Sequence, residues 1–572
     1  MNWLHRRLPA SLIVLCFALP TRAQQPVSQP TVVFTDVTQD LGIRWTHVNG
    51  ATPEKYLIEA MGGGAAFLDY NRDGRLDLLL VDSGCHKFSV NCRPSGNTLY
   101  RQNADGTFTD VTKAAGLAAT PTYGMGVAVG DYDNDGFPDI YITGFPRNVL
   151  YHNNKDGTFT DVTQKAGVSA EGWSTSAAWF DYDHDGQPDL FVGRYMDWDY
   201  SRNPYCGEHR PGYRSYCHPD QFPSLSSRLY HNNGDGTFTD VTEKAGLAIA
   251  GKALGVVAFD FNRDGWLDLY VANDTVRNFL FRNNHDGTFT EVGLEAGVAY
   301  GSNGKAQSGM GVDAADVDGD GLPELWVANI DYEPNNLFHN NGDGTFTDVT
   351  SESKLGLMAL LFSGFGTRIT DYDNDGKLDM FVLNGHPLDN IQLLHDAVTA
   401  AERPFLVENQ GKGKFEEVGQ QHGEIFSRQL NGRGLAMGDF DNDGDEDFLL
   451  VQNGRPPVLL RNDGGNRNAW IGFELEGKAS GRDAIGALVT VTAAGRVQVR
   501  ERVGGSSYCS SSDPRLLFGL GKAEQVNKVE VRWPTGAVST LEHVQARKYY
   551  RIEEPSSAKW PASAPKKRKP NT

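Results

Sequence analysis

The chain reads D-Y-N-R-D-G-R-L-D from Asp69 to Asp77, and the apolar run L-L-L-V comes next. This pattern of an acidic loop and an apolar run occurs seven times. Oxygen atoms from positions 1, 3, 5 and 9, with the carbonyl of position 7, are the ligands that Ca²⁺ takes in acidic loops. Position 6 is Gly in every copy, because the loop must reverse its direction there. The pattern therefore predicts seven calcium-binding loops, each followed by a short β-strand. The copies begin at Asp69, Asp131, Asp181, Asp260, Asp316, Asp371 and Asp439.

The predicted ligands occupy the same five positions in each loop, and the ions are predicted to be structural. The loops are not EF-hands, because position 12 is apolar (Leu80, Ile142) where an EF-hand needs Glu, and strand-like runs follow the loops. In chain order the predicted ligands are Asp69, Asn71, Asp73, Arg75, Asp77, Asp131, Asp133, Asp135, Phe137, Asp139, Asp181, Asp183, Asp185, Gln187, Asp189, Asp260, Asn262, Asp264, Trp266, Asp268, Asp316, Asp318, Asp320, Leu322, Glu324, Asp371, Asp373, Asp375, Lys377, Asp379, Asp439, Asp441, Asp443, Asp445 and Asp447.

A second phrase, F-T-D-V or a close relative, accompanies the acidic loops. Several strands in each repeat of 50 to 79 residues are typical of a β-propeller blade. The first F-T-D-V precedes the first acidic loop and none follows the last loop, so the N-terminal strand must complete the final blade and close the ring. We therefore expect an all-β, seven-bladed β-propeller over residues 31–465. The copies begin at Phe34, Phe108, Phe159, Phe238, Phe289, Phe346 and Phe415.

Residues 466–555 alternate apolar and polar side chains between Gly-containing turns, which predicts a small β-sandwich-like domain packed against the propeller. They contain G-R-D-A-I-G-A (481–487), G-G-S-S-Y (504–508), S-D-P-R-L-L-F-G-L-G (512–521) and V-R-W-P-T-G (531–536). These stretches resemble an ASPIC/UnbV domain, and the acidic loops with their Gly- and Ala-rich leading runs resemble FG-GAP/VCBS repeats, the blades of integrin α-subunit propellers. Together they resemble the cartilage acidic protein family, which implies an adhesion-like or matrix-like role.

Residues 1–23 are typical of a cleaved signal peptide, with a basic start, an apolar run from Leu8 to Leu19 and small residues ending at Ala23. This predicts export to the periplasm or the extracellular space. No apolar stretch is long enough to span a membrane. Residues 556–572 are predicted to be a disordered tail. The net charge of −20 disfavours nucleic acid and anionic lipid as partners, because both require clustered Lys and Arg.

The cysteines fall into two close pairs and one single residue. Cys85 and Cys92 lie seven residues apart and Cys206 and Cys217 eleven apart, which predicts two local disulfides in an oxidising compartment. An alternative for the second pair is a zinc site with His209 and His218. Cys509 remains as a free thiol, at a position where the ASPIC/UnbV resemblance leads us to expect an apolar residue.

The leading functional hypothesis is a calcium-binding scaffold for protein–protein or cell-surface contacts. The sequence holds no G-x-S-x-G, H-E-x-x-H or Walker motif, so no catalytic residue is predicted. One alternative is an exported isomerase, cyclase or lyase that uses the propeller channel, for which His386 and His218 are the residues to test. Another is a carbohydrate-binding protein. In the last domain, Arg515, Arg532 and Trp533 could form a ligand surface. The alternative is that Trp533 belongs to the core and that the two arginines are solvated or paired.

Overall fold

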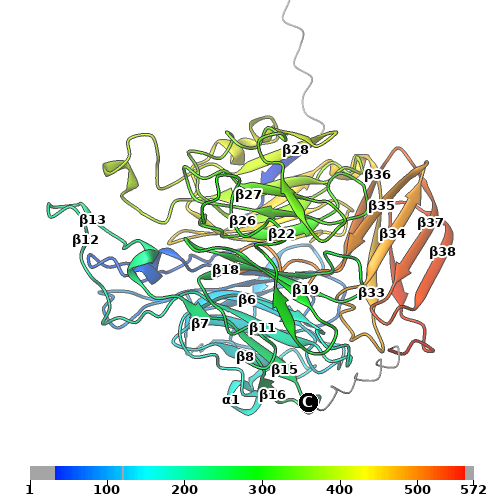
Figure 1. Cartoon of the computed structure of the whole chain (residues 1–572), viewed down its shortest axis with the longest axis horizontal. Helices are drawn as coiled ribbons and strands as arrows, with labels where there is room; N and C mark the ends of the chain where they lie inside the picture. The colour runs from blue at the N-terminus through cyan, green and yellow to red at the C-terminus, as the bar shows by residue number, and fades with distance from the viewer. Residues whose placement is uncertain (1–31, 119–121, 561–572) are drawn as a thin grey trace, which may run out of the picture.

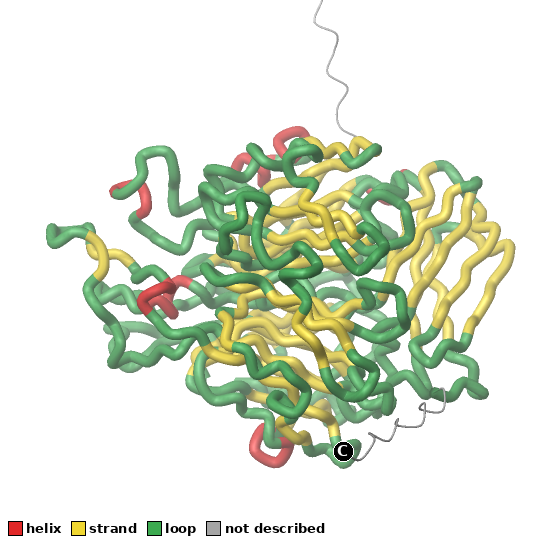
Figure 2. Tube along the Cα trace, viewed as in Figure 1, coloured by secondary structure: helices red, strands yellow, loops and turns green. Residues whose placement is uncertain are grey.

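The computed structural model describes residues 32–118 and 122–560, and they form an almost entirely β structure (Figure 1). Figure 2 shows strands through both parts of the molecule, with helices confined to short segments. The predicted signal peptide and the tail beyond residue 560 lie outside the described residues. Among the helices of the described segments, none has the length and apolar character needed to cross a membrane.

The larger part of the described chain consists of seven four-stranded antiparallel sheets that share one strand order. In every sheet the first strand precedes an acidic loop, and the second strand begins at the ninth position of that loop. The first strands are β2 (Ala65–Leu68), β6 (Tyr123–Gly130), β10 (Ser174–Phe180), β18 (Ala253–Phe259), β22 (Val312–Ala315), β26 (Gly364–Thr370) and β30 (Gly432–Gly438). The second strands are β3 (Asp77–Leu80), β7 (Asp139–Phe145), β11 (Asp189–Arg194), β19 (Asp268–Asn273), β23 (Glu324–Val327), β27 (Asp379–Asn384) and β31 (Asp447–Gln452).

In five sheets a Gly- and Asp-containing turn joins the third strand to the fourth, whereas β28 and β29 are joined by a Gly-Lys-Gly turn and the last sheet takes its fourth strand from the N-terminal end. The fourth strand carries the F-T-D-V phrase or a close relative. The third strands are β4 (Thr98–Gln102), β8 (Val149–Asn153), β15 (Arg228–Asn232), β20 (Phe279–Asn283), β24 (Asn336–Asn340), β28 (Phe405–Gly411) and β32 (Val458–Asp463). The fourth strands are β5 (Phe108–Asp110), β9 (Phe159–Asp161), β16 (Phe238–Asp240), β21 (Phe289–Glu291), β25 (Phe346–Asp348), β29 (Lys414–Glu417) and, from the N-terminal end, β1 (Val33–Asp36).

The seven sheets form a closed ring. Their first strands contact one another in the order β2, β6, β10, β18, β22, β26 and β30, and β30 contacts β2 again. β1 pairs with β32, with Val33 opposite Asp463 and Asp36 opposite Leu460, so the N-terminal strand completes the last sheet. The predicted all-β propeller fold and its closure by strand exchange are therefore confirmed. Without β1, the last sheet would have three strands and β32 would be an open edge; pairing with β1 removes that edge.

The C-terminal domain consists of two sheets that enclose its own apolar core. One sheet has the order β36–β33–β39, in which β33 (Ala469–Glu476) pairs parallel to β39 (Lys548–Glu553). The other has the order β35–β34–β37–β38. Trp533 is buried in the core between them, so Trp533 is not a ligand surface. The remaining strands are β34 (Leu488–Ala493), β35 (Arg496–Glu501), β36 (Leu516–Gly521), β37 (Gln525–Arg532) and β38 (Val538–Gln545).

Ordered contacts continue into the first residues of the predicted tail. The Trp560 ring stacks on His184 of an acidic loop, with 4.0 Å between ring centroids, and its Nε1 donates to the Ala479 carbonyl at 2.9 Å. Trp560 therefore contacts both an acidic loop of the propeller and the C-terminal domain.

The segment Gly504–Asp513, which we name the plug, leaves the C-terminal domain and enters the axis of the propeller. It forms hydrogen bonds with the first strands of all seven sheets. Examples are Val127 N to Cys509 O at 3.1 Å, Ala258 N to Gly504 O at 2.7 Å and Ser507 N to Val312 O at 2.6 Å. Gly64 and Gly126 make room for it, because a Cβ on either would lie less than 3.0 Å from Cys509. The full set of partner strands is β2, β6, β10, β18, β22, β26 and β30.

The connections outside the four-stranded sheets contain two disulfides and several short elements. Both predicted disulfides are present, Cys85–Cys92 and Cys206–Cys217, and the second excludes a zinc site that uses these cysteines. Cys509 is a free, buried thiol inside the plug. The short elements are β12 (Cys206–Gly207), β13 (Arg214–Ser215), β14 (Leu225–Ser226), β17 (Ala250–Gly251), α1 (Thr163–Ala166), η1 (Leu57–Ala60), η2 (Pro219–Gln221), η3 (Ile391–Leu393), η4 (Gly419–Gln421), η5 (Glu424–Ser427) and η6 (Gly465–Arg467).

Ring closure can be tested at Phe34. Its side chain is buried, and its ring lies 5.7 Å from the rings of Phe426 and Phe448. We expect Phe34→Ala to lower the free energy of unfolding by about 3–5 kcal/mol, because it leaves a cavity where β1 joins the last sheet. Val33→Ala on the same strand is the control, since Val33 is 37% exposed. Equal effects of the two changes in urea denaturation would contradict a closing role for Phe34.

Candidate metal centres

Each acidic loop has the same backbone path between its first and second strands. The residue at position 4 has a left-handed conformation, for example Asn134 with φ 56° and His184 with φ 60°. Gly at position 6 also has a positive φ in all seven loops, between 81° and 97°. The sequence prediction of a sharp reversal at this glycine is therefore confirmed, since L side chains rarely adopt such φ values.

The carboxylates at positions 1 and 5 hold the loop in shape. Asp131 accepts hydrogen bonds from the backbone N–H groups of Asp135 and Gly136, at 2.9 and 2.7 Å. Asp135 accepts one from Phe137 N at 3.0 Å. The same bonds recur in the other loops, for example from Gly186 N to Asp181 and from Gln187 N to Asp185. These hydrogen bonds hold the loop in its turn and direct its carboxylates toward one another.

The loops bring carboxylate oxygens into clusters that could hold a cation. Ligand atoms of Asp131, Asp133 and Asp135 all lie within 4.8 Å of one another, as do those of Asp181, Asp183 and Asp189. Buried oxygens in other loops lack any hydrogen-bond partner, namely Oδ2 of Asp268 and Asp379 and Oδ1 of Asp445. An unpaired buried carboxylate oxygen is costly. An oxygen-rich donor set of this kind fits a hard divalent cation such as Ca²⁺.

The carboxylate at position 9 connects the loop to the third strand of its own sheet. It is at most 2% exposed in every loop. The backbone N–H of the third strand's terminal amide residue donates to it, as from Asn153 to Asp139 at 2.8 Å and from Asn462 to Asp447 at 2.8 Å. One carboxylate therefore fixes both the acidic loop and the third strand of the same sheet.

The side chain of the same amide residue reaches the preceding sheet. Asn153 Nδ2 donates to the carbonyl of Tyr70, the second position of the previous acidic loop, at 2.9 Å. The first sheet is linked to the last in the same way, by Gln102 Nε2 to the Phe440 carbonyl at 2.9 Å. The sequence reasoning missed these amides, because it assigned ligands only within the acidic loops and these residues lie outside them. The seven donors are Gln102, Asn153, Asn232, Asn283, Asn340, Asn409 and Asn462.

In three loops a histidine of the third strand lies beside the carboxylates, and in a fourth His285 Nε2 lies 3.0 Å from Asp264; the sequence reasoning missed these as well. His152, His231 and His339 precede the amide residue on β8, β15 and β24. His231 Nδ1 lies 3.2 Å from Asp189 and 3.5 Å from Asp183. The bond to Asp189 is the main reason that the pKa of His231 is raised to about 9. A charged imidazole supplies part of the positive charge that these clusters need.

Burial raises the pKa values of the carboxylates at positions 1 and 9 of all seven loops, and repulsion from nearby carboxylates adds to the shift. Burial is the largest cause, and it raises the pKa of Asp77 to about 8 and that of Asp131 to about 8. The pKa of Glu324, at position 9 of its loop, is raised to about 9, again mainly by burial and then by Asp318. A nearby cation would favour the ionised form of these groups.

The acidic loops also form the surface on which the C-terminal domain rests. Tyr549 Oη donates to Asp439 Oδ2 at 2.7 Å, and Gly519 N donates to Asp371 Oδ2 at 3.1 Å. Arg500 of β35 lies 3.6 Å from the same Asp371 oxygen. The sequence alone gave Asp371 no role beyond its loop, but the structure gives it a second role between the domains.

Two protein families match this chain, one over the repeats with acidic loops and one over the C-terminal domain. The family described as FG-GAP-like repeat matches residues 69–142, 132–192, 224–271, 260–327, 316–382 and 395–450, which together make up more than half of the chain. The family described as ASPIC and UnbV matches residues 477–559. The resemblance drawn from the sequence is thus confirmed for both parts of the molecule.

Whole-protein comparisons give more distant relatives. Cartilage acidic protein 1 of Homo sapiens is 30% identical over 307 residues, which are 52% of this chain and 43% of that protein. The Mus musculus protein of the same name is 28% identical over 306 residues, 52% of this chain and 44% of its own length. The match therefore spans less than half of either relative.

Solved structures give only weak likenesses. An Agrocybe aegerita lectin that recognises non-reducing terminal N-acetylglucosamine has a TM-score of 0.35 at 17% identity, covering 62% of this chain and 79% of the lectin. YCF48 bound to a D1 peptide has a TM-score of 0.38 at 8% identity, covering 70% and 91%. At these scores neither likeness carries weight.

Metal dependence can be tested at Asp316, whose carboxylate bonds only within its own loop, to Gly319 N and Gly321 N. An ion at about 100 times its dissociation constant stabilises the folded state by about 2.7 kcal/mol. We expect Asp316→Ala to cost about that much more in calcium buffer than in chelator, read by thermal denaturation. Asp343→Ala is the control, because Asp343 forms a similar turn to Thr345 in a loop without the acidic pattern. An equal cost with and without calcium would show that the Asp316 loop is an ordinary turn.

The pH dependence of stability should differ between metal-free and calcium-loaded protein. Raised carboxylate pKa values mean that the folded, metal-free chain holds protons that the unfolded chain releases from pH 4 upward. Its stability should therefore fall as the pH rises towards about 8, the pKa of Asp77 and Asp131. Calcium should remove this loss, because it binds the ionised carboxylates. The melting temperatures at pH 6 and pH 9 test this, and a metal-free protein that is more stable at pH 9 would refute it.

Proposed function

This chain belongs to the FG-GAP-like repeat family and ends in an ASPIC and UnbV domain, and from that premise we propose that it is an exported, calcium-binding interaction scaffold. Calcium is assigned to the acidic loops because their donors are carboxylate and carbonyl oxygens. Its role is structural, since the loops support both the ring of sheets and the C-terminal domain. Two disulfides and the cartilage acidic protein relatives support an extracellular or periplasmic location.

The observation that carries the proposal is the filled propeller axis. Propellers that act as enzymes place their active sites at the mouth of the central channel. Here the plug enters the channel from the side of the C-terminal domain. At the opposite end of the channel, the Tyr508 hydroxyl of the plug donates to the Met61 carbonyl beside η1 at 2.7 Å. Phe365, Met125 and Leu254 pack around Tyr508 with no more than 1% of their surface exposed. A filled axis favours a scaffold over a channel enzyme.

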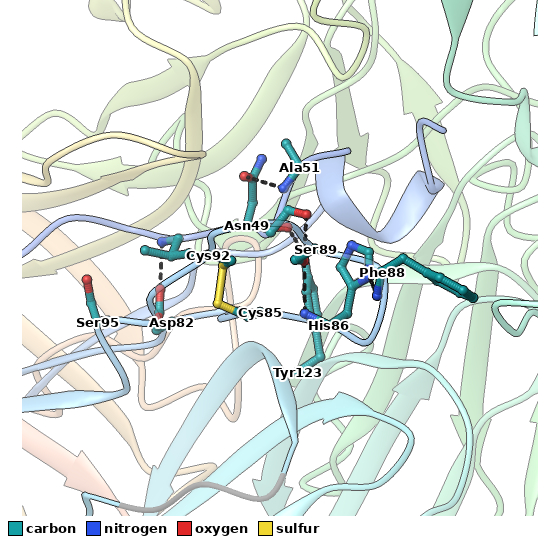
Figure 3. Close-up of a disulfide and its surroundings, with 12 residues drawn as sticks. Asn49, Ala51, Asp82, Cys85, His86, Phe88, Ser89, Cys92, Ser95 and Tyr123 are labelled. Carbon is teal, nitrogen blue, oxygen red and sulfur yellow. Dashed lines mark hydrogen bonds between the residues drawn. A yellow bond between two sulfur atoms is a disulfide. The ribbon is translucent and has the colours of Figure 1, made fainter. Parts of the chain in front are cut away.

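The two disulfide loops lie at the end of the molecule opposite the C-terminal domain, where Figure 1 places β12 and β13. Glu59 of η1 anchors both of them. Its carboxylate accepts a hydrogen bond from Tyr216 at 3.2 Å and lies 3.1 Å from His86 Nε2. Figure 3 shows His86 and Phe88 in the same loop as the Cys85–Cys92 disulfide. A buried anchor and a disulfide give these loops the rigidity that a binding surface needs.

Aromatic and cationic side chains gather on these loops. Phe88 stacks on Tyr56 with 5.2 Å between centroids, and Lys87 Nζ lies 4.9 Å from the Phe88 ring. Phe88 and Tyr205 are each 41% exposed, and Val90 is 79% exposed. Exposed aromatic residues on rigid loops are typical of the centres of protein interfaces. We therefore place the partner-binding surface on the Cys85–Cys92 and Cys206–Cys217 loops.

The rival functions are an exported isomerase, cyclase or lyase and a carbohydrate-binding protein. His386 is 3% exposed, and its Nε2 lies 3.1 Å from Asp331, so the residue is a buried, paired histidine. His218 is exposed and its ring accepts the Asp220 N–H at the start of η2. Carbohydrate binding uses exposed aromatic rings as well, and glycan arrays separate it from protein binding.

The proposal is tested by binding assays on the exposed disulfide loop. The immobilised chain is used to capture partners from the extracellular or periplasmic fraction of the source cells in calcium buffer. We expect Val90→Asp to abolish this capture, because the substitution puts a charge in an apolar contact. Val497→Asp on the C-terminal domain, where Val497 is 52% exposed, should leave capture unchanged. Capture that is equal for both variants would place the surface elsewhere. Turnover in a metabolite screen that is lost on changing His386 or His218 would overturn the scaffold assignment.

A further inference from the structure

A groove of about 660 Å³ lies beside the end of β1, where the N-terminal strand joins the last sheet. Residues between 36 and 46 form one wall, and residues 428–430 and 452–457 form the other. Gln452 ends β31, and Asp447 of an acidic loop begins it, so the groove lies at the end of this strand away from the acidic loops. The volume is within the range of about 300–1,000 Å³ that is usual for sites of small ligands.

The charges along this groove have the opposite balance to those of the whole chain. The chain has 53 Lys and Arg residues against 73 Asp and Glu residues. The groove, in contrast, is lined by three arginines, Arg44, Arg428 and Arg455, and by one carboxylate, that of Asp36. A recess lined by one sign of charge concentrates its field and attracts ligands of the other sign. The lining therefore favours an anionic ligand.

Asp36 neutralises only one of the three arginines. Its Oδ2 accepts a hydrogen bond from Arg428 Nη1 at 2.6 Å, and its Oδ1 accepts the N–H and the hydroxyl of Thr38 at 3.2 and 2.6 Å. Both oxygens of this carboxylate are therefore used. In the part of the chain that the structure describes, neither Arg44 nor Arg455 forms an ion pair. Two guanidinium groups of the groove thus lack a counter-ion.

Arg44 is held in position, while most of its N–H groups remain available. Its Nη1 donates to the backbone carbonyls of Gln39 and Ile43, at 2.8 and 3.1 Å. Its backbone N–H donates to the Tyr100 hydroxyl at 3.1 Å. These bonds leave Nε and Nη2 of the guanidinium free for the two oxygens of a carboxylate. Neutral carbonyl partners orient the side chain without cancelling its charge.

The neutral polar side chains of the groove are also free to bind a ligand. Gln39, Thr46 and Gln429 are exposed and line the groove. Among the described residues, none forms a hydrogen bond with these three side chains. Amide and hydroxyl groups can both donate and accept hydrogen bonds, as the hydroxyl groups of a sugar do. The lining thus combines donors for carboxylates with groups that match sugar hydroxyls.

We propose that this groove binds an acidic sugar, a short oligosaccharide that carries carboxylates. Arg44 and Arg455 bind the carboxylates, which a guanidinium can hold with two parallel hydrogen bonds. Gln39, Thr46 and Gln429 bind hydroxyl groups of the sugar rings. The ligand would contact both walls of the groove and so link the chain after β1 to the last sheet. No residue of the groove belongs to either disulfide loop, so this site and the proposed partner surface can fail separately.

The test is titration calorimetry of the calcium-loaded full chain with a β-1,4-linked trisaccharide of glucuronic acid. We expect saturable binding that weakens as salt is added, because salt screens exposed charges. The matching trisaccharide of glucose, which lacks the carboxylates, should not bind. Arg455→Gln should weaken the binding about ten-fold, because it removes hydrogen bonds to a charged group. Arg532→Gln is the control, because it removes one exposed charge from the C-terminal domain and should leave the binding unchanged.

Thermal denaturation separates ligand binding from a structural role of Arg455. Without sugar, Arg455→Gln should melt at the temperature of the unmodified chain, because the exposed side chain has no ion pair to lose. The acidic trisaccharide should raise the melting temperature of the unmodified chain and raise that of the variant less, since a ligand of the folded state stabilises it in proportion to its saturation.

Three results would overturn the proposal. They are no saturable binding of the acidic trisaccharide, equal binding of the glucose trisaccharide, and equal binding of the acidic trisaccharide by Arg455→Gln and the unmodified chain. A triglutamate peptide is the last comparison, because it carries carboxylates without sugar hydroxyls. Tighter binding of this peptide than of the acidic trisaccharide would assign the groove to an acidic peptide and refute the sugar assignment.

Discussion

The buried carboxylate at the ninth position of each acidic loop is the group on which the rest of the propeller depends. It lies at the start of the second strand and accepts a backbone N–H from the third strand of its sheet. The amide residue that donates this bond also holds the loop of the preceding sheet. Asn153 shows both contacts, to Asp139 at 2.8 Å and to the Tyr70 carbonyl at 2.9 Å. Loop shape, strand position and sheet-to-sheet packing therefore change together.

This arrangement has a cost that explains the composition of the loops. A carboxylate that is almost wholly buried beside two or three others is expensive to ionise. A bound cation, or a histidine such as His231, offsets that cost. The same loops support the C-terminal domain through contacts such as Tyr549 to Asp439. The plug from that domain then fills the axis around which the loops are arranged. The ring, the loops and the C-terminal domain thus form one structural unit, and the disulfide loops lie outside it.

The sequence predicted the features that arise from repetition. Seven acidic loops with Gly at position 6 predicted the strand that follows each loop, and the position of Phe34 before the first loop predicted closure by β1. The plug could not be predicted in this way. It occurs once, has no strand or helix periodicity, and bonds to residues such as Val127 that lie hundreds of positions away. The linking amides were missed for a different reason, because they lie outside the acidic loops and the sequence does not show which carbonyl of the preceding sheet their side chains reach.

The seven loops are not seven copies of one site, because the third-strand residue before each linking amide differs. It is an arginine in three sheets, a histidine in three and Glu408 in one. Burial raises the pKa of Asp373 and that of Asp441 to about 6. The charge of Glu408 adds to the rise at Asp373, whereas the charge of Arg461 opposes it at Asp441. An arginine repels a cation that Glu408 attracts. If these loops bind calcium as proposed, their affinities should therefore be graded around the ring. Two of the loops, those that begin at Asp371 and Asp439, also contact the C-terminal domain, so the loss of either loop would disturb both domains.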